Sequence, residues 1–133
     1  MRVAPLIAWI GWNIMRILTF KNEEINLLGF DYLKQYEDEN LIINFEDCKL
    51  KNLLLDADNV SRLSFYNCCL ENCKLVSNNT KVYINGSILV DSEINSGLKG
   101  KYSCIDIDVS IIRNCDINEE TYVRNCVKFE QNI

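Results

Sequence analysis

A short apolar pattern recurs along this chain at steps of about 20 residues, and it limits the folds that the chain can adopt. The copies begin at positions 18, 43, 63, 82, 105 and 121, so the steps are 25, 20, 19, 23 and 16 residues. A copy such as residues 43–50 (INFEDCKL) alternates apolar and other residues before an Asn or Asp, a small residue and a Leu or Ile. Alternation gives a strand with only two or three inward side chains. Successive copies must therefore stack to close a core.

Stacking of these strands about 4.8 Å apart predicts ladders of similar inward side chains. One ladder holds large apolar residues, a second holds small residues suited to a tight turn, and a third holds Leu and Ile. The members are Phe45, Phe65, Ile84, Ile107 and Val123; Cys48, Cys68, Ser87, Ser110 and Cys126; and Leu50, Leu70, Leu89 and Ile112. We expect the Asn and Asp residues between strands at corners, because they tolerate left-handed backbone and form local hydrogen bonds.

Residues 68–75 and 110–117 place a small residue, and two positions later a large apolar residue, every five residues. In these stretches the chain resembles the pentapeptide-repeat proteins, in which four such units make one coil of a right-handed quadrilateral β-helix. The unequal later coils are similar to the broader class of right-handed parallel β-helices. The same phase runs through Phe45, Leu50, Leu55, Val60, Phe65, Leu70 and Leu75. The resemblance covers residues 43–128 and implies an all-β solenoid, a small right-handed parallel β-helix of about five or six irregular coils.

Residues 1–42 differ from the repeats and are expected to form an N-terminal apolar segment and cap, ahead of solenoid repeats at 43–133. The apolar positions of residues 3–18 have helical spacing, which predicts a partly helical segment packed over the open end of the solenoid. Asn22 or Asp31 is a candidate N-cap for a short helix that follows. Membrane contact by residues 3–18 is the less favoured alternative, because their polar face is poor in Lys and Arg.

The chain has seven cysteines and no histidine. An odd number cannot be fully paired within one chain, and the spacing lacks the two close pairs that a zinc site needs, so we expect no metal. We predict reduced, buried thiols at Cys48, Cys68 and Cys115, with Cys69 pointing outward. Reduced thiols indicate a cytoplasmic or similarly reducing compartment.

Catalytic constellations are missing from the sequence. Without histidine there is no Ser-His-Asp or Cys-His arrangement, and the glycines form no phosphate-binding loop. Asp106 and Asp108 would share one strand face, but pairs of acids on a solvated face are common outside glycosidases. We therefore expect a protein that is not an enzyme and has no cofactor.

The outward positions of the strands supply the candidate binding residues. The first outward face mixes tyrosines and charged residues and suits contacts with a protein, and the second carries an apolar patch suited to self-association. The candidate binding face consists of Glu46, Tyr66, Tyr83, Asp106, Asp108, Tyr122 and Arg124, and the candidate self-association patch consists of Ile88, Val90 and Ile111. We expect the patch to be covered either by residues 3–18 or, preferably, by a second copy in a homodimer.

These features predict a non-enzymatic β-solenoid interaction or scaffold module that binds an unidentified protein partner through a lateral sheet face. The formal net charge of −5 argues against direct nucleic-acid binding. The resemblance implies one alternative, since some pentapeptide-repeat proteins imitate duplex DNA and inhibit or protect type II topoisomerases. A small carbohydrate-binding β-helix is the other alternative.

Overall fold

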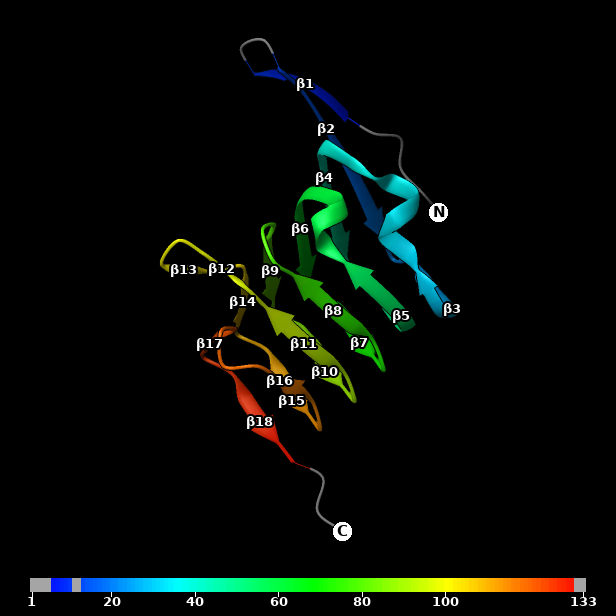
Figure 1. The fold of residues 1–133 in the computed structure, drawn as a ribbon. Helices are drawn as coiled ribbons and strands as arrows, with labels where there is room; N and C mark the ends of the chain where they lie inside the picture. Colours follow the sequence, from blue (N-terminus) through cyan, green and yellow to red (C-terminus); the bar gives the residue numbers. More distant parts are fainter. Residues whose placement is uncertain (1–5, 11–12, 131–133) are drawn as a thin grey trace.

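The computed structural model describes residues 6–10 and 13–130 and shows parallel coils stacked into a β-solenoid of about four turns (Figure 1). Every repeat copy found in the sequence forms a strand of one sheet. This first sheet contains β1 (Leu6–Ile10), β2 (Asn13–Lys21), β4 (Asp38–Glu46), β6 (Val60–Tyr66), β9 (Lys81–Asn85), β14 (Ile105–Asp108) and β17 (Tyr122–Arg124), in that order. The solenoid has about four turns, fewer than the five or six coils expected.

A second sheet forms the facing wall of the solenoid. Three short segments connect a strand of the second sheet to the next strand of the first sheet along the chain. They are two 3-10 helices, η1 (Tyr32–Tyr36) and η2 (Ala57–Asn59), and a small hairpin of β12 (Leu98–Lys99) and β13 (Tyr102–Ser103). The second sheet contains β3 (Glu24–Asp31), β5 (Lys49–Asp56), β7 (Cys69–Glu71), β8 (Lys74–Ser77), β10 (Ile88–Val90), β11 (Glu93–Ser96), β15 (Ile111–Arg113), β16 (Asp116–Ile117) and β18 (Val127–Phe129).

The inward ladders predicted from the repeat are confirmed. The rings of Phe20, Phe45 and Phe65 stack in succession, with centroids 5.0 and 5.2 Å apart and planes within 13° of parallel. Phe20 therefore extends the predicted aromatic ladder by one rung. The residues of the five-residue phase, from Phe45 to Leu75, are all at most 3% exposed. Their burial shows that the second and third coils have four inward-facing sides.

Small residues at the first corner bond to the coils on either side of their own. The Cys68 thiol lies 3.3 Å from the carbonyl oxygen of Phe45, and the backbone N–H of Cys68 donates to Ser87 Oγ at 3.0 Å. Left-handed backbone occurs at the predicted corner residues, and Asn72 donates to the side chain of Asn52 across the second corner at 2.7 Å. The corners are Asn22, Asp47, Asn67, Gly86, Val109 and Asn125, and Asn52, Asn72, Asp91 and Asn114.

The predicted helix within residues 3–18 is wrong for the part that the structure describes. Residues 6–10 and 13–21 are antiparallel strands, and the β1–β2 hairpin extends beyond the body of the solenoid in Figure 1. β-Branched and aromatic residues favour a strand here, and the free edge of the first sheet offers hydrogen bonds that a helix would leave unused. Residues 1–5 and 11–12 lie outside the described residues. No helix among the described residues has the length and apolar character to cross a membrane.

The strands within residues 13–42 pair with the repeats that follow them, with one shift of register in β3 and one at the start of β4. β2 is parallel to β4 and β3 is parallel to β5, so the division expected between residues 42 and 43 falls inside β4. In the described part of the expected cap, the helical segment is η1. Asp31 stands at its N-cap position without a capping side-chain hydrogen bond, while Tyr32 packs edge-on against Phe20. This short helix therefore covers the aromatic ladder at the first coil.

Most of the unequal coil lengths are absorbed on one side of the solenoid, where the second sheet returns to the first, and the first coil also has a bulge in β3 between Asn26 and Phe30. The extra or missing residues lie in η1, in η2, in the turns at 78–80 and 118–121 and in the β12–β13 hairpin. The 78–80 turn is held by Asp58, whose carboxylate accepts backbone hydrogen bonds from Asn78, Asn79 and Thr80 at 2.8–3.0 Å. Burial raises the pKa of Asp58, but these donors outweigh it and leave the pKa below its ordinary value.

The alternation of inward and outward residues can be tested at two adjacent positions. Phe65→Ala removes a stacked, fully buried ring, so we expect the free energy of unfolding to fall by about 3–5 kcal/mol. Tyr66→Ala, one residue away and outward, should change it by no more than about 0.5 kcal/mol. Urea unfolding of both variants measures the difference. Equal losses would contradict the inward and outward assignment.

Val109 has a φ of +50°. Among the described corner residues it is the exception, because the others are Asn, Asp or Gly. A β-branched side chain is strained in left-handed backbone, whereas Asn tolerates it. Because Val109 is 56% exposed, Val109→Asn costs little burial and should stabilise the fold by about 1 kcal/mol. Val127, 53% exposed in a strand, is the matched control, and Val127→Asn should not stabilise. Thermal unfolding of both variants measures the change in stability. No gain in stability for Val109→Asn would refute backbone strain at this corner.

Candidate functional site

The first sheet presents the seven predicted binding residues on one outward face. In-register pairing sets Glu46 beside Tyr66, and Asp106 between Tyr83 and Tyr122. The residues come from five strands: Glu46 from β4, Tyr66 from β6, Tyr83 from β9, Asp106 and Asp108 from β14, and Tyr122 and Arg124 from β17. Strand stacking thus brings together residues that are up to 78 positions apart, from 46 to 124.

Three tyrosine rings stand exposed on this face. Tyr66, Tyr83 and Tyr122 are 61%, 44% and 50% exposed, and each is on a strand that pairs with its neighbours in the solenoid. Tyr83 and Tyr122 are two strands apart, which corresponds to about 10 Å. Rings held on a hydrogen-bonded sheet lose little conformational entropy when a partner covers them. The face is therefore a preorganised aromatic surface.

The acids of the same face are neutralised by neighbouring cations. Asp106 lies 2.9 Å from Lys81 Nζ, and Asp108 lies 3.2 Å from Arg124 Nε. The two cations also lie over rings, at 5.3 Å for Lys81 and Tyr83 and at 5.6 Å for Arg124 and Tyr122. Glu46 faces Lys21 at 3.7 Å. Each predicted acid is thus a counter-ion in a charge pair, and the face has no continuous acidic stripe among the described residues.

Sequence reasoning missed the residues that border this face on the irregular side of the solenoid. Gly97 and Cys104 are joined by a backbone hydrogen bond of 3.0 Å, and between them the β12–β13 hairpin projects from the solenoid. It carries Lys99, Lys101 and Tyr102. The coil length of 23 residues was the signal for an insertion here, but it did not show where the insertion would point.

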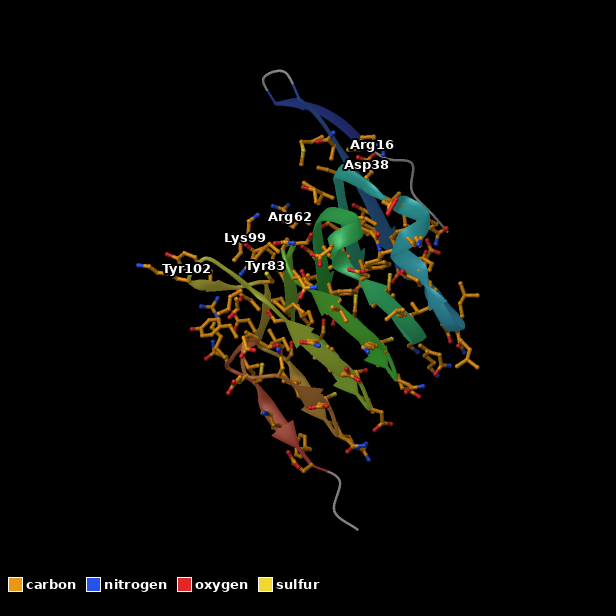
Figure 2. The ribbon with its side chains drawn as sticks, viewed as in Figure 1. Arg16, Asp38, Arg62, Tyr83, Lys99 and Tyr102 are labelled. Atoms are coloured by element: carbon orange, nitrogen blue, oxygen red, sulfur yellow. The ribbon has the colours of Figure 1, made fainter. Side chains whose placement is uncertain are left out.

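The hairpin creates two hollows next to the tyrosine face. One has a volume of about 310 Å³ and the other of about 390 Å³. The first is lined by Ser61, Asn79, Lys81, Lys99, Tyr102, Ser103 and Cys104, and the second by Lys81, Lys101, Tyr102, Ser103, Asp106 and Tyr122. Figure 2 shows Arg62, Tyr83 and Lys99 near the end of β9, with Tyr102 farther out on the hairpin. Another ion pair, between Arg16 and Asp38, lies below β1 in the same view.

The second outward face carries the candidate self-association patch. Ile88 and Ile111 pair in register and are each 43% exposed, and Val90 is half-buried beside Arg113. Val127 continues the column after Ile111. Cover by residues 3–18 is wrong for the described part of that segment, because β1 and β2 extend the other sheet. Cover by a second copy stays a prediction.

A polar groove of about 560 Å³ runs along the second corner. Eight of its thirteen lining residues carry amide, hydroxyl or charged groups, three leucines add to a large apolar share of the surface, and no aromatic ring of the described residues lines it. The lining residues are Leu28, Gly29, Asn52, Leu53, Leu54, Asn72, Cys73, Lys74, Asp91, Ser92, Glu93, Asn114 and Asp116. The carbohydrate-binding alternative would use such a groove, but the exposed tyrosines of the first sheet lie on another face.

The seven cysteines all lie in the described residues and all are free. Cys48 and Cys68 are buried and Cys69 is only half-buried, in agreement with the ladder register. Cys115 is half-buried rather than buried, because the coil below it is short and leaves this corner partly open. Burial raises the pKa of Cys68 to about 11 and also raises the pKa of Cys115. Within the described residues, no group of acids and cysteines is arranged to hold a metal ion.

Thiol reactivity should follow this burial. With a polar reagent at pH 8, we expect Cys69, Cys115 and Cys126 to react in the native protein, and four to react only after unfolding: Cys48, Cys68, Cys73 and Cys104. Mass spectrometry of the labelled peptides identifies the thiols that react in the native protein. Rapid native labelling of Cys68 would contradict the burial.

The pH dependence of stability tests the same burial. Because folding raises the pKa of Cys68 above the ordinary 9.0, its contribution to stability should be lost as the pH rises from about 9 towards 11. Urea unfolding measures this loss.

The comparisons with known proteins add no relative. No protein-family model matches this chain, and a search of curated proteins finds no matching sequence. The β-solenoid is therefore established by the structure alone, and the site is interpreted from its own geometry.

Proposed function

We propose that this protein is a non-enzymatic interaction module of the pentapeptide-repeat type, which binds a protein partner through the tyrosine face of its first sheet. The observation that supports this most is the exposure of Tyr66, Tyr83 and Tyr122 on one rigid sheet. Tyrosine and arginine are enriched where proteins bind one another, because their rings and planar groups bury much area and keep a polar end. Arg124 over Tyr122 adds such a group to the surface.

The other two functions receive less support from this geometry. A DNA-mimicking inhibitor or protector of a type II topoisomerase needs an extended row of unpaired negative charges, but Asp106, Asp108 and Glu46 each have a cation partner. A carbohydrate site combines stacking rings with hydrogen-bonding groups in a hollow, whereas the polar groove and the tyrosines lie on different sides. Protein binding fits a broad surface of paired charges and exposed rings.

We also propose a reducing compartment, such as the cytoplasm. Seven free thiols support it, because several are half-buried and would be open to oxidation in an extracellular setting.

The proposal can be tested on the full chain by capturing partners from a lysate of its source cells and then measuring the purified partner. Tyr83→Ala combined with Tyr122→Ala should weaken that partner's affinity at least tenfold, since central aromatic residues dominate such interfaces. Phe129→Ala removes a ring that is also half exposed, at 53%, but from the second sheet. This matched control should change the affinity less than about twofold.

Partner binding that survives the tyrosine double variant unchanged would overturn the proposed face. If Phe129→Ala loses partner binding and the tyrosine double variant keeps it, the interface lies on the second sheet instead. Unfolding midpoints of both variants show whether the fold is intact, which we expect because the side chains point outward.

A further inference from the structure

The β12–β13 hairpin carries positive charge that the folded solenoid does not use. Lys99 and Lys101 are exposed on it, and Arg62 pairs in register with Lys81 on the first sheet. Asp106 neutralises Lys81, whereas Arg62, Lys99 and Lys101 have no salt-bridge partner among the residues that the structure describes. Three unpaired cations thus gather in a chain whose net charge is −5.

An aromatic ring accompanies these cations. Lys99 and Tyr102 are opposite one another in the hairpin register, so their side chains share one face of the hairpin. Gly100 makes the turn with a φ of +65° and open space around it. The exposed Leu98 and Tyr102 bury nothing in the solenoid core, and exposed apolar side chains on an insertion are typical of binding surfaces.

The two hollows beside Tyr102 set the size of the ligand group. Their volumes, about 310 and 390 Å³, are at the lower end of ligand pockets, so each suits one or two side chains. Lys99 lines the smaller hollow and Lys101 the larger, while Lys81 and Tyr102 line both. The larger hollow also contains Tyr122, which makes it continuous with the tyrosine face.

We propose that these hollows bind the carboxylates of an acidic peptide segment in the protein partner. This rests on the proposed function and adds the chemistry of the partner to it. Carboxylates of Asp or Glu pair with Lys99 and Lys101 in the hollows, and Arg62, which pairs in register with Lys81, adds positive charge beside them. The adjoining apolar atoms of the segment cover Tyr102.

A nucleic-acid strand suits the same surface less well. Its phosphates would continue past the three cations and meet Asp108, whose side chain remains about one-fifth exposed. The affinity of a strand also depends on many phosphate contacts, and this cluster supplies only three unpaired cations. A short acidic segment matches the number of charges and the size of the hollows.

Fluorescence anisotropy with the full chain tests the proposal. The probe is a labelled short peptide of alternating Glu and Ser, and its control has Gln in place of each Glu. We expect the Glu peptide to bind, with an affinity that falls as salt rises, and the Gln peptide not to bind. Lys99→Gln combined with Lys101→Gln should weaken binding roughly tenfold.

A charge-matched control separates a local site from general attraction. Lys34→Gln combined with Lys49→Gln removes two other exposed lysines, which lie on η1 and β5, and should change binding less than about twofold. Equal weakening in both double variants would overturn the site. Absence of binding by the Glu peptide would overturn it as well, and so would tighter binding of an oligothymidylate than of the peptide at equal salt.

The outcome is separable from that of the proposed function. If the purified partner depends on Tyr83 and Tyr122 but is indifferent to Lys99 and Lys101, the tyrosine face stands and the acidic-segment site falls. If the partner depends on the lysines and the Glu peptide competes with it, both stand. If the Glu peptide binds at the lysines while the partner depends on neither set of residues, the tyrosine face falls and so does the assignment of the acidic segment to that partner.

Discussion

In-register stacking of parallel strands is the constraint on which the rest of this structure depends. A residue in one coil lies directly above its equivalent in the next, about 4.8 Å away. The side chain at each inward position must therefore pack against the equivalent side chains of the coils next to it. The consecutive rings of Phe20, Phe45 and Phe65 show the result. The same spacing lets Cys68 reach Phe45 and Ser87, and lets Asn72 reach Asn52, so corner and core share one repeat distance.

This constraint also explains where the molecule has room for function. Three sides of each coil are committed to the stacked ladders, and a residue inserted there would move every following side chain to the wrong face. Most length changes fall on the returning side, which holds η1, η2, the turns at 78–80 and 118–121 and the β12–β13 hairpin. The bulge of β3 between Asn26 and Phe30 adds an even number of residues, so the side chains after it keep their faces. The hollows around Tyr102 form there. Variation in coil length therefore builds a site without disturbing the core.

Charge on the outward faces is organised by the same stacking. Neighbouring coils bring Asp106 to Lys81 and Asp108 to Arg124, so acids that look free in the sequence are paired in the fold. These exposed pairs add little stability, but they leave the surface nearly neutral around the tyrosines. Three of the described cations without such partners, Arg62, Lys99 and Lys101, are on or beside the inserted hairpin. An acidic chain thus acquires a local positive surface next to its aromatic face.

The sequence by itself determined the ladders, the corners and the outward columns, because alternation and the small-x-large spacing are local properties that stacking copies unchanged from coil to coil. Tertiary structure decided what local spacing leaves open. The apolar residues near the N-terminus fit a helix or a strand, and the free edge of the first sheet selected the strand in residues 6–10 and 13–21. Arg62, Lys81 and Lys99 approach one another only because two coils stack and an insertion folds beside them. Such contacts depend on the direction of a loop in space, and no sequence period records that direction.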